Sequence, residues 1–161
     1  MTARRIAFVQ EGLGTSVECT LLEDLAPRSA EFLWSLAANG ASVGVNHAIW
    51  TGPELSIPLP VSSLPEGVSV APVPLENATS YPRQGDVVLA WLAAGSARGL
   101  PPGDFFDIGL FYDEGARLLM PFGWLQANVA AQVAAHSLPL LRAIALDIRQ
   151  HGSSKLRLQR L

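Results

Sequence analysis

Short apolar segments that end at glycine- or proline-containing turns recur along the chain, and this pattern constrains the fold more than any other feature. Glycines in the segment QEGLG (10–14) suit the positive φ of a hairpin turn between two such segments. The segment TGP (51–53) separates two others in the same way. We expect strands at 4–9, 15–22, 42–50, 54–59, 68–73, 85–93 and on both sides of a turn at 113–115. The sequence therefore predicts a mainly β fold of about eight antiparallel strands, closed as a barrel or stacked as a sandwich.

Two segments have helical instead of strand periodicity. Pro27 suits the first position of a helix, and the apolar residues after it recur every three or four positions until Asn39-Gly40 ends the pattern. A second helix is expected at about 138–151, where Gly152 is a suitable C-terminal cap. Both helices are expected to pack on the β structure.

Charged residues are scarce in this chain of 161 residues, which is of ordinary size for one domain spanning 1–161. Asp, Glu, Lys and Arg make up 16% of the residues, against about 25% in average soluble domains. A net charge of -3 argues against a nucleic-acid partner, and the basic tail 152–161 is expected to be a solvated terminus.

The low content of charged residues predicts an apolar interface between subunits, and thus a homodimer or larger homo-oligomer.

The sequence also bears on the compartment. Cys19 is the single cysteine, and the N-terminal residues have no pattern of a secretory signal. The longest apolar run, 87–94, is far shorter than the roughly 20 residues of a membrane helix. We therefore expect a cytoplasmic protein with no membrane partner.

Four segments in order give the chain a family resemblance. The stretch VECTLLEDLAPRSAEFLWSL (17–36) joins a strand, an acidic turn with D-x-x-P and a helix with F-L-x-x-L, and it is similar to the N-terminal unit of cyclophilins. Together with IWTGPELSIPL (49–59), LENATSYPRQGD (75–86) and MPFG (120–123), the chain resembles a bacterial family of uncharacterised proteins with a cyclophilin-like fold. The resemblance covers roughly 4–134 and implies a closed antiparallel β-barrel of about eight strands with two helices packed on it.

The resemblance also allows a test of prolyl isomerase chemistry. Cyclophilins place an arginine directly after a histidine, and that arginine donates a hydrogen bond as the prolyl amide twists. The matching stretch here is VNHAIW (45–50), in which Ala48 takes the place of the arginine. Alanine has no donor, so we expect no peptidyl-prolyl isomerase activity, and whether the protein is an enzyme of another kind stays open.

Several polar and aromatic residues are candidates for a ligand site at the barrel mouth. A carboxylate pair with an amide and a phenol would suit a small amide, ureide or carboxylate ligand. The candidates are His47, Trp50, Glu54, Glu76, Asn77 and Tyr81. His47 and Trp50 lie three residues apart on the expected strand 42–50, so we expect them to point to opposite faces.

Each candidate also has a purely structural interpretation. Glu76 and Asn77 can satisfy backbone groups in a turn, Tyr81 can pack before Pro82, and Trp50 can belong to the core. The alternative function is therefore that of a non-catalytic interaction or oligomeric protein.

Other chemistry-bearing residues give weaker signals. His47, His136 and His151 lack the spacing of metal ligands, so neither a metal nor another cofactor is expected. Cys19 alternates with apolar neighbours and is expected to be a buried, inert thiol. The segment 96–104 is expected to be a surface loop. We expect the acidic residues to form a solvated rim; they are Asp104, Asp107, Asp113 and Glu114.

Overall fold

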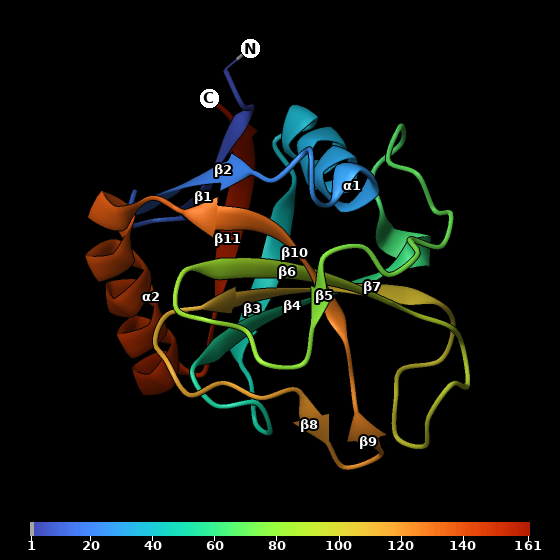
Figure 1. Cartoon of the computed structure of the whole chain (residues 1–161). Helices are drawn as coiled ribbons and strands as arrows, with labels where there is room; N and C mark the ends of the chain where they lie inside the picture. The colour runs from blue at the N-terminus through green and yellow to red at the C-terminus, as the bar shows by residue number, and fades with distance from the viewer. Residues whose placement is uncertain (1) are drawn as a thin grey trace.

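A closed antiparallel β-barrel forms the body of the protein in the computed structural model, which describes residues 2–161 (Figure 1). The strands follow the order β2-β1-β11-β3-β4-β7-β6-β10, and β10 pairs back with β2 and so closes the ring. Their bounds are β1 (Arg5–Gln10), β2 (Ser16–Leu21), β3 (Ser42–His47), β4 (Glu54–Pro60), β6 (Asp86–Leu92), β7 (Phe105–Phe111), β10 (Ala127–Val133) and β11 (Ser153–Arg160). The expected barrel with two helices is confirmed.

Alternation along β4 and β7 separates the barrel interior from its outer wall. On β4, Leu55 and Ile57 are fully buried in the main core, as are Ile108 and Leu110 on β7. The residues between them point to the outer wall, because successive strand side chains face opposite sides. Cys19 on β2 also lies in the core, where burial raises the pKa of its thiol far above the usual range. The prediction of a buried thiol is confirmed.

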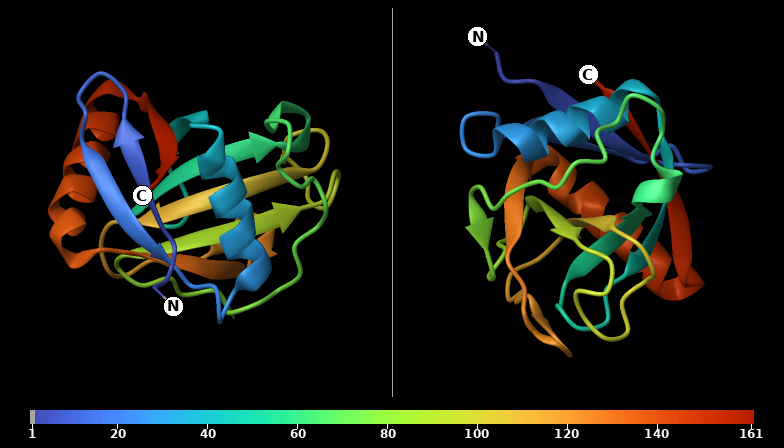
Figure 2. Two further views of the ribbon diagram at one scale, coloured as in Figure 1. Left: turned by 90° about the horizontal axis from the view of Figure 1, so that it is seen from above. Right: turned by 90° about the vertical axis from the view of Figure 1, so that its right-hand side faces the viewer.

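The helices α1 (Pro27–Ala38) and α2 (Leu138–His151) pack on different sides of the barrel and complete its core (Figure 2). Phe32 of α1 stacks on Phe106 of β7 with 4.2 Å between the ring centroids. Ile144 and Ile148 of α2 are buried on the same core. Gly152 ends α2 with a φ of 92°, a conformation that glycine adopts without strain, and the chain then turns directly into β11.

The strand β11 corrects the expectation of a solvated basic tail. It lies between β1 and β3 as a full member of the barrel, with Leu156 and Leu158 fully buried. In the alternating segment KLRL, Lys155 and Arg157 point outside and the two leucines point inside, so the tail is an amphipathic strand.

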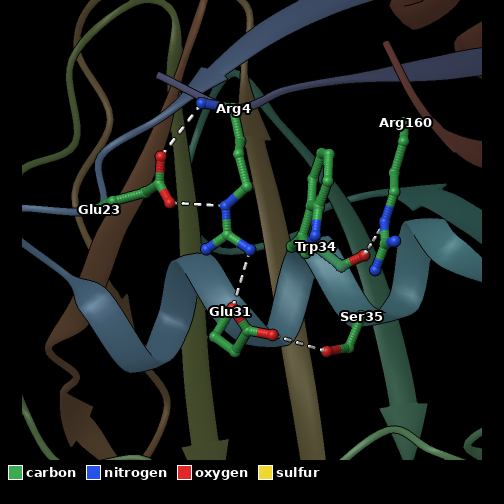
Figure 3. A network of polar contacts seen from close by, with 6 residues as sticks. All are labelled: Arg4, Glu23, Glu31, Trp34, Ser35 and Arg160. Carbon is green, nitrogen blue, oxygen red and sulfur yellow. Dashed lines mark hydrogen bonds and ion pairs between the residues drawn. The ribbon is translucent and has the colours of Figure 1, made fainter. Parts of the chain in front are cut away.

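An aromatic and cationic stack fixes the end of β11 to α1. The indole of Trp34 lies between the guanidinium groups of Arg160 and Arg4, at 4.2 and 4.9 Å from the ring centroid (Figure 3). Arg160 Nε also donates a hydrogen bond of 3.0 Å to the carbonyl oxygen of Trp34. Arg4 in turn pairs with Glu23 and Glu31. These contacts join both ends of the chain to the same helix.

Other strand predictions need correction. Residues 68–73 form no strand, and the 3-10 turn η1 (Val61–Ser63) and irregular chain lead instead to the short β5 (Ala78–Thr79), which pairs with β10. The expected strand after the turn at 113–115 is only the small hairpin of β8 (Leu119–Met120) and β9 (Gly123–Trp124). The strand β10 was missing from the prediction, because its sequence ANVAAQV is rich in alanine, which has a low strand propensity.

The segment 96–104 is a mostly exposed loop between β6 and β7, as expected. Neither helix within residues 2–161 is long and apolar enough to span a lipid bilayer.

Candidate functional site

A second apolar layer covers part of the outer wall of the barrel. Val88, Phe105 and Phe111 point outward from β6 and β7, and they pack against Ala116 and Leu118 of the segment 112–126. This segment, which carries the β8–β9 hairpin, is tied to the chain before β4 and before β6 by backbone hydrogen bonds from Arg117 to Thr51 and from Leu118 to Ser80. A cavity of about 200 Å³ lies between the segment and the wall.

Two carboxyl groups of neighbouring strands line this cavity. Glu54 of β4 is only 7% exposed, and Asp107 of β7 is half-buried. The strands β4 and β7 are antiparallel, and Ser56 of β4 pairs with Gly109 of β7. Glu54 comes two residues before Ser56 and Asp107 comes two residues before Gly109, so the two residues lie on opposite sides of this pair. Each carboxyl group leans toward this central pair: Ser56 Oγ donates to Asp107 Oδ1 at 3.0 Å, and Glu54 Oε1 lies over Gly109.

Gly109 makes room for the Glu54 side chain. A Cβ atom added to Gly109 would collide with Glu54 Oε1 and would lie 3.0 Å from side-chain atoms of Phe111 and Val88. Thr51 Oγ1 holds the other oxygen of the carboxyl group, Oε2, with a hydrogen bond. The glycine in FFDIGLF is therefore required by close packing in an extended strand and not by a turn.

The two carboxyl groups differ in protonation. Burial raises the pKa of Glu54 to about 8, with a further contribution from the negative charge of Asp107 and a small opposing one from Thr51. Burial also raises the pKa of Asp107 to about 6, opposed by the hydrogen bond from Ser56. Glu54 therefore holds its proton to higher pH than Asp107, and between the two pKa values the cavity presents one proton donor and one acceptor.

The rim of the cavity comes from the end of β3 and the turn after it. His47 Nδ1 lies 2.7 Å from the carbonyl oxygen of Ala48, which can only accept, so this nitrogen carries a proton. His47 Nε2 lies 2.7 Å from the hydroxyl group of Tyr112. Trp50 is 56% exposed beside the same cavity. The prediction that His47 and Trp50 face apart is wrong, because β3 ends at His47 and strand alternation stops there.

The other three predicted site residues lie outside this cavity. Glu76 Oε1 accepts a 2.6 Å hydrogen bond from the backbone N–H of Ser29 in the first turn of α1. Asn77 Nδ2 donates to the carbonyl oxygen of Val129 at 2.9 Å. Tyr81 is exposed and packs on Trp124, with ring centroids 5.4 Å apart. Glu54 and Glu76 therefore do not form the expected pair, and Glu76 and Asn77 satisfy backbone groups instead.

Asp107 is the site residue that sequence reasoning missed, since it was grouped with a solvated acidic rim. Its neighbours in that group do serve surface turns: Asp104 accepts from the N–H of Ala94, and Asp113 from the N–H of Glu114. The signal that distinguishes Asp107 is its place within the apolar segment FFDIGLF. A carboxylate inside a buried strand, on the same face as a glycine, indicates a built polar site.

No group of three or more His, Cys, Asp or Glu side chains among residues 2–161 is arranged to hold a metal ion.

Comparison with known proteins places the fold and the family. The structure of McbB in complex with tryptophan superposes with a TM-score of 0.58 at 14% identity over 96% of this chain, which spans 44% of the McbB chain. The Mimivirus cyclophilin superposes with a TM-score of 0.53 at 12% identity, over 99% of this chain and 88% of that one. At these identities the likeness shows the fold alone, which is cyclophilin-like. No curated protein matches the sequence. A family model described as "Protein of unknown function (DUF3830)" matches residues 9–160, and the chain therefore belongs to this family.

Proposed function

We propose that the protein binds a small amide or ureide in the cavity on the outer wall of the barrel. The observation that carries the proposal is that Glu54 and Asp107 line one cavity, on either side of Gly109. An amide or ureide presents an N–H donor and a carbonyl acceptor along one edge. The N–H group would donate to the Asp107 carboxylate, and the carbonyl oxygen would accept from the protonated Glu54.

Charge favours this ligand class over a carboxylate. A carboxylate in the cavity would face the ionised Asp107 in a partly dry environment, where like charges repel strongly. A neutral amide or ureide satisfies both carboxyl groups without adding a charge. Of the three ligand classes expected from the sequence, amides and ureides therefore fit the cavity better.

Size and wall chemistry limit the ligand further. A volume of about 200 Å³ corresponds to roughly six or seven water molecules at about 30 Å³ each. Side chains of Val88, Leu118, Met120 and Leu125 supply apolar walls. The ligand is therefore a single small ring or a short chain with one apolar face and one polar edge.

Calorimetric titration at pH 7 tests the proposal with small amides and ureides and with one matched pair, benzamide and benzoate. Hydantoin, succinimide and benzamide are compared with benzoate, and tryptophan is included because McbB is known in complex with it. We expect at least one amide or ureide to bind and benzoate to bind at least tenfold more weakly. Asp107→Leu, which removes the acceptor and leaves an apolar side chain in the cavity wall, should lose this binding, whereas Glu114→Gln on an exposed turn should retain it. Equal binding by Asp107→Leu, or no binding by the wild type, would reject the proposal.

We further propose that the protein does not catalyse prolyl isomerisation. Ala48, which takes the place of the cyclophilin arginine in the sequence comparison, lies on the rim of the cavity and has no side-chain donor. In a protease-coupled assay with a proline-containing peptide, the protein should leave the isomerisation rate at the buffer value. An acceleration like that of a cyclophilin would contradict this prediction.

A further inference from the structure

We propose that Glu54 and Asp107 act together as a general acid and a general base that enolise the bound ligand at the carbon next to its carbonyl group. This inference rests on the proposed function, because it assigns a reaction to the same cavity. Asp107 would remove the proton from that carbon, and Glu54 would give its own proton to the carbonyl oxygen. The substrate class is therefore a small amide or ureide that carries a hydrogen next to a carbonyl group.

The hydrogen bonds within the protein leave one oxygen of each carboxyl group for this task. Ser56 occupies Asp107 Oδ1, and Thr51 occupies Glu54 Oε2. Glu54 Oε1 and Asp107 Oδ2 have no hydrogen bond from another side chain among residues 2–161, and both residues line the cavity. The two occupied oxygens fix the carboxyl groups: Glu54 Oε1 lies over Gly109, and Asp107 approaches the same Ser56–Gly109 pair from the other side.

The remaining titratable group on the rim is already engaged. His47 uses one ring nitrogen for the Ala48 carbonyl oxygen and the other for the Tyr112 hydroxyl group. Enolisation requires only one acid and one base, which is what the cavity supplies.

The reaction balances without an added reagent. The C–H bond breaks, its electron pair forms the carbon–carbon double bond of the enol, and the carbonyl π pair forms a bond to the proton of Glu54. Asp107 ends protonated and Glu54 ends ionised, and the reverse transfer restores both groups. When the proton on Asp107 exchanges with solvent before it returns, the substrate carbon acquires a solvent hydrogen.

The surroundings of the two carboxyl groups support the division of roles. Burial raises the pKa of both groups, but the pKa of Glu54 is raised further by the negative charge of Asp107, whereas Ser56 stabilises the ionised form of Asp107 with a hydrogen bond, so Glu54 holds its proton to higher pH. A carboxylic acid kept neutral by an apolar environment can donate to the oxygen on which charge develops. Each such group contributes typically about 10²–10⁴-fold to a rate.

Hydrogen–deuterium exchange measures the reaction directly. The full chain is incubated with (S)-5-methylhydantoin in D₂O, and loss of the C5–H signal is followed by proton NMR against a buffer control. We expect wild-type protein and Glu114→Gln to accelerate exchange. Glu54→Gln and Asp107→Asn should each slow it by about 100-fold or more. The rate should be highest between pH 6 and 8, where Asp107 is ionised and Glu54 is protonated.

Binding of the same hydantoin, measured by calorimetry, separates the two proposals. Glu54→Gln keeps a donor for the carbonyl oxygen but has no proton to transfer, so retained binding with lost exchange supports the acid role. Wild-type protein that binds the hydantoin without accelerating exchange would overturn this inference and leave the proposed function standing. Exchange that is equally fast in Glu54→Gln and Asp107→Asn would also overturn it. Absence of binding to any amide or ureide would reject both.

Discussion

The Glu54 carboxyl group makes stability dependent on pH. Its pKa is about 8 in the folded protein, well above the usual value of about 4.3 for glutamate, because burial disfavours the charged form. A group with a raised pKa stabilises the fold fully at low pH, and this contribution is lost as the pH rises toward the folded-state pKa. Asp107, with a pKa of about 6, acts in the same direction over a lower range.

We therefore predict that the free energy of unfolding decreases between pH 5 and pH 9, and that Glu54→Gln removes most of this decrease. Between pH 5 and pH 9, the free energy of unfolding of the wild type should fall by on the order of 4 kcal/mol more than that of Glu54→Gln. Urea denaturation at several pH values measures it, with Glu114→Gln as the control because its side chain is exposed. A Glu54→Gln profile parallel to that of the wild type would show that Glu54 is already ionised at neutral pH.

Among the elements, β11 determines whether the barrel closes. It pairs with β1 on one side and β3 on the other, so its loss would leave two strand edges unpaired. Leu156 and Leu158 project from it into the main core and are fully buried.

We predict that Leu158→Ala lowers the free energy of unfolding by about 2–5 kcal/mol, because it removes buried methyl groups and leaves a cavity. Leu161→Ala, at a side chain that is 47% exposed just beyond the strand, is the matched control and should change it by about 0.5 kcal/mol or less. Urea denaturation of both variants makes the comparison. Equal effects of the two changes would place β11 outside the cooperative core.

The N-terminus of α1 depends on a residue from a distant loop. The N-cap residue Ala26 makes no side-chain hydrogen bond to the helix, and Glu76 Oε1 instead accepts the hydrogen bond from the N–H of Ser29. A carboxylate there also interacts favourably with the helix dipole. We predict that Glu76→Ala lowers stability by about 1 kcal/mol and leaves ligand binding unchanged. Thermal unfolding and calorimetry test the two parts, and loss of binding at unchanged stability would return Glu76 to the ligand site.

At the scale of the whole molecule, exposed apolar side chains gather near the cavity. Tyr81 and Trp124 contact each other, Leu119 faces Trp124 in the β8–β9 hairpin, and Trp50 shares the cavity with Met120 of that hairpin. The large side chains exposed in this region are Ile49, Trp50, Tyr81, Leu119, Phe122 and Trp124. Patches of this kind are commonly covered by another protein.

We propose that this surface mediates self-association, as the low charge content predicts. Light scattering at micromolar concentration should give a mass of at least twice the 17.1 kDa of one chain. Trp124→Ser should shift the equilibrium toward the monomer, whereas Leu146→Ser on the exposed side of α2 should not. A single 17.1 kDa species would contradict the proposal. If the protein is a monomer and also binds no ligand, the alternative role as an oligomeric protein loses its main support as well.

The sequence by itself determined the features that depend on local periodicity. Pro27 and the apolar stripe after it predicted α1, and the stripe ending at Gly152 predicted α2 with the bounds that the structure has. Alternation predicted the strands of the first hairpin and the burial of Cys19. Such patterns specify which side of an element is buried, because the helical and strand repeats are fixed by backbone geometry.

The tertiary structure alone decided which buried faces meet. Glu54 was correctly placed on a strand, but its partner is Asp107 on β7 and not Glu76, since strand register brings together residues that are distant in sequence. The alanine-rich β10 and the basic β11 became strands because each pairs on both sides within the closed ring, which outweighs weak local propensity. The local sequence indicates which side of a strand is buried. Which strands lie next to it depends on pairing across the whole chain, and this pairing forms the candidate site.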